Sequence, residues 1–185
     1  MAIRDDIEKY IPCCEQELRD KELILRFMYS NPDAFQRDNL TAHMTASAWI
    51  VNPGRDKVLM VYHRLYDSWS WTGGHADGET ELAAVALREV REETGVQSAR
   101  LLSRDILSLE ILTVDGHEKH GKYVPSHLHM NVTYLVEADD NDPLIVCEAE
   151  NSAVQWFSPE DALRASTEPW FVERIYKKLI EKSKA

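Results

Sequence analysis

Three glutamates crowded into one stretch of helix constrain this chain more than any other feature. Residues 73–96 read GGHADGETELAAVALREVREETGV. With successive residues about 100° apart, as in an α-helix, Glu89, Glu92 and Glu93 fall within one arc. That arc continues the apolar stripe that begins at Val85, whereas a solvated charged face normally lies opposite such a stripe. The carboxylates are therefore expected where the helix leaves the core.

Carboxylates one helical turn apart repel one another, and a divalent cation removes that repulsion. Their oxygens are hard ligands that suit Mg²⁺ or Mn²⁺. Arg88 lies four residues before Glu92 and can orient it. Thr80 is expected to cap the start of the helix and Gly95 its end. The residues alone leave open a second interpretation, a solvated surface helix whose glutamates pair with Arg88 and Arg91.

The composition limits the classes of function. The chain has 185 residues, enough for one domain with a proper core. Its net charge of −11 argues against a nucleic-acid partner, which needs a surplus of Lys and Arg. The amino-terminal residues have neither the apolar stretch of a signal peptide nor a membrane span, so no membrane partner is expected. Three cysteines without disulfide or metal spacing fit reduced thiols, and we expect a cytoplasmic protein.

The apolar spacing divides the chain into a helical extension and a mixed domain. Over residues 1–40 the spacing is helical, with one apolar set around Ile7 and Ile11 and another around Leu18 and Leu23. Strands are expected at 45–51, 57–63, 105–114, 127–138 and 153–157, the first two forming a hairpin with a five-residue loop. Helices are expected after the N-cap Ser158 and over residues 170–182. This order predicts an α/β fold, a mixed β-sheet covered by helices on both faces.

The helix and the glycines before it resemble the signature of the Nudix hydrolase family (MutT-like), G-x5-E-x7-R-E-U-x-E-E-x-G-U with U aliphatic. The matching positions are Gly74, Arg88, Glu89, Val90, Glu92, Glu93, Gly95 and Val96. The early glutamate of the signature falls on Thr80, with Glu79 and Glu81 on either side, so its role is not carried over. The resemblance implies a Nudix-like α/β/α sandwich with a mixed β-sheet over residues 41–185, behind an N-terminal helical extension over residues 1–40.

The resemblance also implies a reaction, the metal-dependent hydrolysis of a nucleoside diphosphate linked to another moiety. Carried over by position, Glu89, Glu92 and Glu93 would bind Mg²⁺ or Mn²⁺, and the Gly74 carbonyl would add a ligand. Glu92 and Glu93 would thereby serve catalysis, with Arg88 orienting the glutamates through a salt bridge. The expected partner is a small-molecule diphosphate of nucleotide type. The N-terminal helices would either form a homodimer interface or cap the sheet.

A general base is expected outside the helix as well as within it. Glu148 and Glu150 precede the last predicted strand, in a region where the family often brings an extra glutamate near the metals. An acidic solvent loop explains each of them equally well, and we assign the catalytic role to Glu150. Glu110 in the predicted strand 105–114 is a weaker third candidate.

Histidines and tryptophans supply the candidates for substrate binding. His127 and His129 lie two residues apart, on one face of a predicted strand, and His117 and His120 precede them. These imidazoles fit a structural role, contact with a substrate phosphate, or a zinc site, and we assign substrate contact to His127. Trp71 is expected to stack on a nucleobase, although core packing is the alternative for it and for Trp69.

Two other functions remain open on the same scaffold. A nucleotide-binding sensor or regulatory module would bind a similar ligand without turnover, but the metal glutamates are all present. An isoprenoid diphosphate isomerase would need a catalytic cysteine near the core sheet, and the chain offers Cys13, Cys14 and Cys147.

Overall fold

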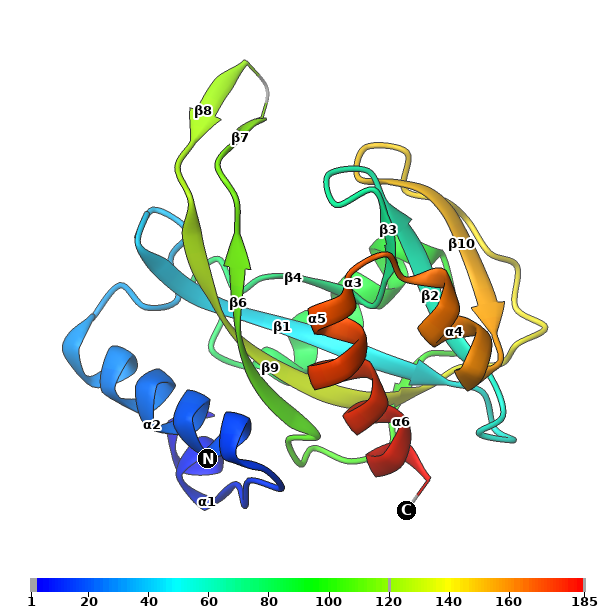
Figure 1. Ribbon diagram of the computed structural model, residues 1–185, viewed down its shortest axis with the longest axis horizontal. Helices are drawn as coiled ribbons and strands as arrows, with labels where there is room; N and C mark the ends of the chain where they lie inside the picture. Colours follow the sequence, from blue (N-terminus) through cyan, green and yellow to red (C-terminus); the bar gives the residue numbers. More distant parts are fainter. Residues whose placement is uncertain (1–2, 120, 185) are drawn as a thin grey trace.

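A mixed β-sheet forms the centre of the computed structural model, which describes residues 3–119 and 121–184 (Figure 1). The eight-stranded sheet has the order β10-β2-β1-β9-β5, with β3 paired to β2, β4 to β1 and β6 to β9. Its strands are β1 (Ala42–Val51), β2 (Val58–His63), β3 (Ser68–Ser70), β4 (Thr72–His75), β5 (Arg100–Leu101), β6 (Ser108–Val114), β9 (His127–Glu137) and β10 (Asn151–Phe157). A separate hairpin, β7 (His117–Lys119) with β8 (Lys122–Val124), projects beyond the sheet (Figure 1).

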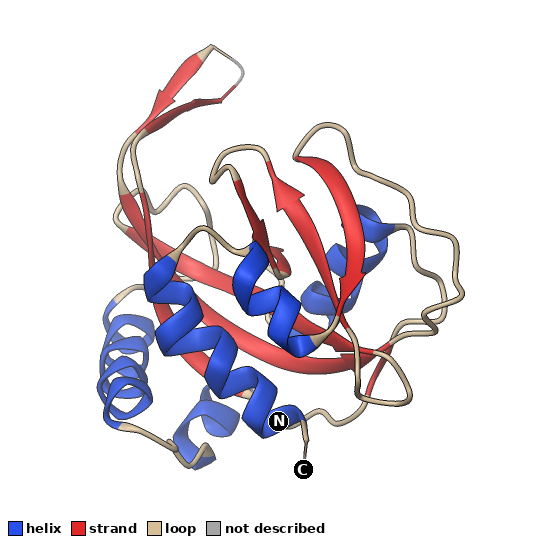
Figure 2. Ribbon diagram, turned by 45° about the vertical axis from the view of Figure 1, so that its right-hand side comes forward, coloured by secondary structure: helices blue, strands red, loops and turns tan. Residues whose placement is uncertain are grey.

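The sheet carries a separate core on each face. The helices are α1 (Ile3–Lys9), α2 (Glu15–Ser30), α3 (Leu82–Thr94), α4 (Pro159–Ala165), α5 (Pro169–Phe171), the π-helix η1 (Val172–Tyr176) and α6 (Lys177–Ser183). Because side chains alternate along a strand, Met44 and Ile50 of β1 pack with apolar residues of α1, α2 and α3. Trp49 and Val51 pack instead with residues of η1 and α6. Figure 2 shows helices on both sides of the sheet, and the predicted α/β/α sandwich is confirmed.

Apolar spacing and capping residues predicted most of the helices and strands, but the short strands were not predicted. The first two predicted strands form the expected antiparallel hairpin, although β1 begins at Ala42 rather than at residue 45. Ser158 caps α4 by accepting the Asp161 N–H, as predicted. No strand was predicted within residues 67–75 or 115–126, and these segments contain β3 and β4 and the β7–β8 hairpin. These strands are only three or four residues long, too short for an alternating pattern to stand out.

The apolar stripe predicted for the N-terminal helices is partly wrong. Ile11 is 86% exposed, and Leu18 and Leu23 are 45% and 42% exposed. The charged Glu17 is fully buried instead of Leu18 and Leu23. It lies with the buried Ile24 on the face of α2 that packs on the sheet. None of the helices in the described part of the chain combines the length and apolar character needed to cross a bilayer.

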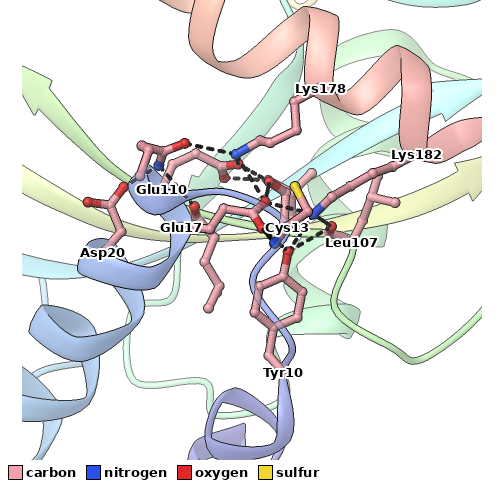
Figure 3. Close-up of polar contacts among 12 residues, drawn as sticks. Tyr10, Cys13, Glu17, Asp20, Leu107, Glu110, Lys178 and Lys182 are labelled. Atoms are coloured by element: carbon pink, nitrogen blue, oxygen red, sulfur yellow. Dashed lines mark hydrogen bonds and ion pairs between the residues drawn. The ribbon is translucent and has the colours of Figure 1, made fainter.

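Buried charges tie α2, β6 and α6 together (Figure 3). Glu17 of α2 and Glu110 of β6 are both fully buried. Lys178 Nζ lies 3.1 Å from Oε1 of each carboxylate, and Lys182 Nζ lies 2.7 Å from Oε1 of Glu17. The Ser108 hydroxyl lies within hydrogen-bond distance of Oε1 of both carboxylates, and its single proton can be donated to either one. This network holds the N-terminal helices against the sheet and against the last helix.

The lysines keep Glu17 ionised. Burial by itself raises the pKa of Glu17, but hydrogen bonds from Lys182 and the Cys13 N–H, with the charge of Lys178, outweigh it and lower the pKa to about 2. Because the folded pKa lies below the unfolded value of 4.5, this carboxylate stabilises the fold above that pH. The stabilisation is lost as the pH falls towards the folded pKa.

Replacing Glu17 with Gln should lower the free energy of unfolding by about 3 kcal/mol, because Lys182 and Lys178 would lose a buried counter-charge. Urea denaturation at neutral pH, followed by circular dichroism, measures the change. The matched control is Glu22→Gln on the same helix, since Glu22 pairs with Arg19 at an exposed site. The control should cost less than about 0.5 kcal/mol. Equal effects of the two substitutions would contradict a stabilising role for the buried network.

Candidate active site

A cleft of about 1090 Å³ opens on the face of the sheet that carries Thr45 and Ser47 of β1. Ligand pockets typically measure about 300–1,000 Å³, so this one has room for a large ligand. It is lined by glutamates of α3, by Gly73 and Gly74 of β4, by several histidines and by residues of the β7–β8 hairpin. The predicted metal-binding residues thus lie around a single opening.

Glu93 is the most deeply buried of the three helix glutamates, at 3% exposed. Its Oε1 accepts the Gly73 N–H at 2.8 Å, and its Oε2 accepts from Asn151 Nδ2 at 2.9 Å. Burial raises the pKa of Glu93 to about 8 against the effect of these hydrogen bonds, and the charges of Glu89 and Glu150 raise it further. The carboxyl group is fixed in position by these hydrogen bonds, and the described residues form no ion pair with it.

Glu89 approaches β4 so closely that a side chain at Gly74 would displace the Glu89 carboxyl group. A Cβ atom at Gly74 would lie 2.4 Å from the carboxyl carbon of Glu89. Arg88 Nη2 donates to Glu89 Oε1 at 2.8 Å and to the His75 carbonyl at 3.2 Å, so it anchors Glu89 to the strand. This ion pair is made with the adjacent Glu89, whereas helical spacing pointed to Glu92. Burial raises the pKa of Glu89, in spite of the opposing charge of Arg88.

The remaining predicted glutamates lie in different environments. Glu92 is exposed on α3 and lines the cleft, and Glu150 lines it from the loop before β10. Glu148 is exposed on the same loop. Glu110 is buried in the network with Lys178 and accepts a hydrogen bond from the Thr133 hydroxyl at 2.9 Å, so it cannot reach a substrate.

The departure from the family signature at Thr80 lies just before the helix. α3 begins at Leu82 with Glu81 in the capping position and without a side-chain capping bond, so the prediction of Thr80 as the N-cap is wrong. The Glu79 carboxylate accepts the Glu81 N–H at 2.9 Å and lines the cleft. At the other end, Gly95 adopts the left-handed conformation with φ of 74°, as predicted.

Aromatic side chains border the cleft, but Trp71 is mostly covered. It is 7% exposed and meets Tyr176 and Phe171 edge-on, with ring centroids 5.8 and 6.5 Å away. Trp69 packs against Phe157. Tyr66, which the sequence did not single out, also lines the cleft and is 37% exposed, so it presents more ring surface to a ligand than Trp71 does.

A group of four histidines lines the cleft, and the sequence indicated only half of it. His127 and His129 share a face of β9 as predicted, and β1 and β4 add His43 and His75. One ring nitrogen of each histidine lies within 4.8 Å of one from every other. His43 and His129 meet because they pair directly in the parallel register of β1 and β9, which no local spacing reveals.

Other candidates from the sequence lie apart from these groups. His117 lines the cleft from β7, and His120 lies outside the described residues. Cys147 is half-buried and lines the cleft, whereas Cys13 and Cys14 are exposed in the segment before α2. An isomerase mechanism would therefore depend on Cys147.

The chain belongs to the family described by the NUDIX domain, whose model matches residues 41–179. Among curated proteins it is similar to the mouse and rat Bis(5'-nucleosyl)-tetraphosphatase (asymmetrical), from Mus musculus and Rattus norvegicus, at 32% and 31% identity over 96 residues. That segment is 51% of this chain and 58% of each relative, so it spans less than two thirds of the relatives' own length.

Solved structures share the fold at lower sequence identity. The C. elegans Ap4A hydrolase in a binary complex has a TM-score of 0.55 at 19% identity, over 76% of this chain and 94% of that chain. The MutT protein from Methanosarcina mazei Go1 has a TM-score of 0.53 at 18% identity, over 78% of this chain and 97% of that chain. These likenesses establish a common fold around the glutamate helix.

The stability of the metal-free protein should depend on the proton of Glu93. Folding raises the pKa of Glu93 from 4.5 to about 8, so the native state keeps a proton that the unfolded chain releases between these values. The free energy of unfolding should therefore fall by about 2 kcal/mol or more between about pH 5 and about pH 8.5. Urea denaturation in the presence of a chelator measures this slope.

Substitution isolates the contribution of Glu93 from that of the histidines. Glu93→Gln fixes a neutral side chain, and Asn151 can rotate its amide to meet it, because Asn151 Oδ1 is buried without a hydrogen-bond partner among the described residues. This variant should lose much of the slope, whereas Glu92→Gln, at an exposed position, should keep it. The same slope in Glu93→Gln and the unsubstituted protein would contradict a retained proton.

Proposed function

We propose that this protein hydrolyses a phosphoanhydride bond in a nucleoside diphosphate linked to another moiety, using Mg²⁺ or Mn²⁺. The observation that carries the proposal is the meeting of the α3 glutamates with the glycines of β4 in one cleft. Membership of the Nudix family supports it, since metal-dependent diphosphate hydrolysis is what the signature implies. We further propose that residues 41–185 form the catalytic domain, with residues 1–40 as the extension.

The residues of the site fit a divalent cation. Glu89, Glu92 and Glu93 offer hard oxygen donors, and the missing side chain at Gly74 leaves room for Glu89 beside a backbone carbonyl. Burial raises the pKa of both Glu89 and Glu93, so each carboxylate would be stabilised as an anion by an added positive charge. When bound, the metal would neutralise phosphate charge and lower the pKa of a bound water.

The surrounding side chains would hold the glutamates and the substrate. Arg88 fixes Glu89, while Gly73 and Asn151 fix Glu93. Glu150 would accept the proton of the attacking water, because it lines the same cleft.

Basic and aromatic residues around the opening would bind the rest of the substrate. Arg64 and Lys122 line the cleft and would contact phosphate oxygens. Because the protein has a net charge of −11, such local positive charges are needed to attract an anionic substrate. Tyr66 would stack on a nucleobase, with Trp71 supplying a ring edge. His127, predicted from the sequence to contact the substrate, lines the same cleft, where it lies within a group of four histidines.

A dinucleoside tetraphosphate is the first substrate to test. The mouse and rat relatives are named for the asymmetrical cleavage of such a compound, and a solved structure of similar fold is an Ap4A hydrolase. The volume of the cleft, about 1090 Å³, supports a substrate larger than a mononucleotide.

The purified full chain should release two unequal nucleotides from diadenosine tetraphosphate when Mg²⁺ or Mn²⁺ is added. Ion-exchange chromatography of the products measures the reaction. ADP-ribose, a nucleotide sugar and a nucleoside triphosphate are assayed as substrates in the same way. Glu92→Gln should lower kcat by about 100-fold or more, because it removes a charge that would hold the metal. Glu160→Gln, at an exposed position on α4, is the matched control and should leave kcat unchanged.

Two outcomes would contradict the proposal. The first is the absence of product from the whole panel with either metal at high protein concentration. If calorimetry then showed nucleotide binding, the sensor function would replace hydrolysis. The second is a normal kcat in Glu92→Gln, which would remove the glutamate cluster from the reaction.

A further inference from the structure

The four histidines of the cleft, here called the imidazole cluster, come together through the sheet and belong to no part of the proposed hydrolysis. His43 pairs with His129 across the β1–β9 register, and His75 of β4 pairs with Thr45, two residues along β1 from His43. His127 lies two residues before His129 on the same face of β9. Strand pairing therefore brings the four imidazole rings together on one face of the sheet.

The rings face one another closely. The ring centroid of His43 lies 4.9 Å from those of His75 and His127 and 5.0 Å from that of His129. The Nε2 atoms of His127 and His129 are 3.2 Å apart. In a tetrahedral zinc site with zinc–nitrogen distances of about 2.0–2.1 Å, two ligand nitrogens lie about 3.3 Å apart. One edge of such a tetrahedron is thus already in place.

Backbone hydrogen bonds select the nitrogens that point inward. His43 Nδ1 lies 3.1 Å from the Asn39 carbonyl oxygen, to which it can only donate. In the neutral ring His43 Nε2 then carries no proton and exposes its lone pair. This atom is buried without a hydrogen-bond partner among the described residues. His127 Nδ1 likewise donates to the Pro125 carbonyl at 2.8 Å. Metal-ligating histidines characteristically donate their other ring nitrogen to a carbonyl in this way.

The charge state of His43 and His129 favours a cation over an anion. Burial lowers the pKa of His43, and burial together with the neighbouring imidazoles lowers that of His129 to about 2. Neutral rings cannot offer a positive charge to a phosphate, but they are the form that binds a metal. Arg37 and Asp77 are the charged groups that also act on His43, and they pair with each other.

We propose that His43, His75, His127 and His129 bind a divalent transition metal, with zinc preferred, at a site separate from the glutamates of α3. Imidazole nitrogens suit zinc, whereas Mg²⁺ prefers oxygen ligands, so the two sites select different ions. Four protein ligands leave no position for a water, and this makes the ion structural. It joins β1, β4 and β9 at the rim of the cleft and adds positive charge to an acidic protein.

The test uses the full chain, stripped of metal and then supplied with excess Mg²⁺ to occupy the carboxylates. Cobalt titration should give the visible absorption of a tetrahedral site, and zinc should displace the cobalt. X-ray absorption of the zinc-loaded protein should show nitrogen ligands at about 2.0–2.1 Å. Binding of one zinc ion should raise the melting temperature.

Variants assign the site to its residues. His127→Gln and His129→Gln should each weaken zinc binding by about tenfold or more, since even residues that only orient ligands have effects of this size. His127 is only half-buried, so its variant keeps the test valid if His129→Gln fails to fold. His117→Gln, in the same cleft but outside the cluster, should leave zinc binding unchanged, as should Glu92→Gln.

Three results would overturn the proposal. They are the absence of zinc binding, unchanged affinity in folded His127→Gln, and loss of binding in Glu92→Gln, which would place the ion on the carboxylates. Because each readout is metal binding rather than turnover, failure here is distinct from failure of the proposed hydrolysis.

Discussion

The parallel pairing of β1 with β9 is the interaction on which the rest of the structure depends. It runs the full length of β1 and sets His43 opposite His129 and Thr45 opposite Asn131. Side chains alternate between faces, so a shift of β9 by one residue would turn His129 and Asn131 toward the apolar core beneath α2 and α3. The cost of burying imidazoles and amides in that core specifies the register. The geometry of the cleft follows from it.

On the same face, hydrogen bonds lead from the cleft to the N-terminal helices. Asn131 Oδ1 accepts from the hydroxyls of Thr45 and Ser47 at 2.9 and 3.0 Å, and Asn131 Nδ2 donates to Glu110 at 3.3 Å. Glu110 in turn shares Lys178 and Ser108 with the buried carboxylate of α2. Buried polar groups are costly unless each has a partner. The interior of the sheet is therefore completed by side chains from both helical layers.

The sequence could predict what depends on local spacing. Glu89 and Glu93 reach the cleft because helical periodicity alone places them, and Gly95 ends the helix through its own backbone freedom. Asn151 and His43 could not be predicted, since they reach the site only through strand pairing. Asn151 is 58 residues from the glutamate that it holds. The buried charge on α2 was missed for a related reason, because its lysine partners lie on the last helix of the chain.

The ion pairs of Glu17 link the N-terminal extension to the last helix of the family domain. The match to the family begins at residue 41, so a chain trimmed there would keep every family position and all of the cleft lining except Arg37, Asp38 and Leu40. It would also leave Lys178 and Lys182, the latter bonded to the Leu107 carbonyl, beside a cavity that Glu17 once filled. The segment shared with relatives and the segment that folds cooperatively thus have different limits. A change at Glu17 in the extension therefore leaves Lys178 and Lys182 of the last helix without that counter-charge.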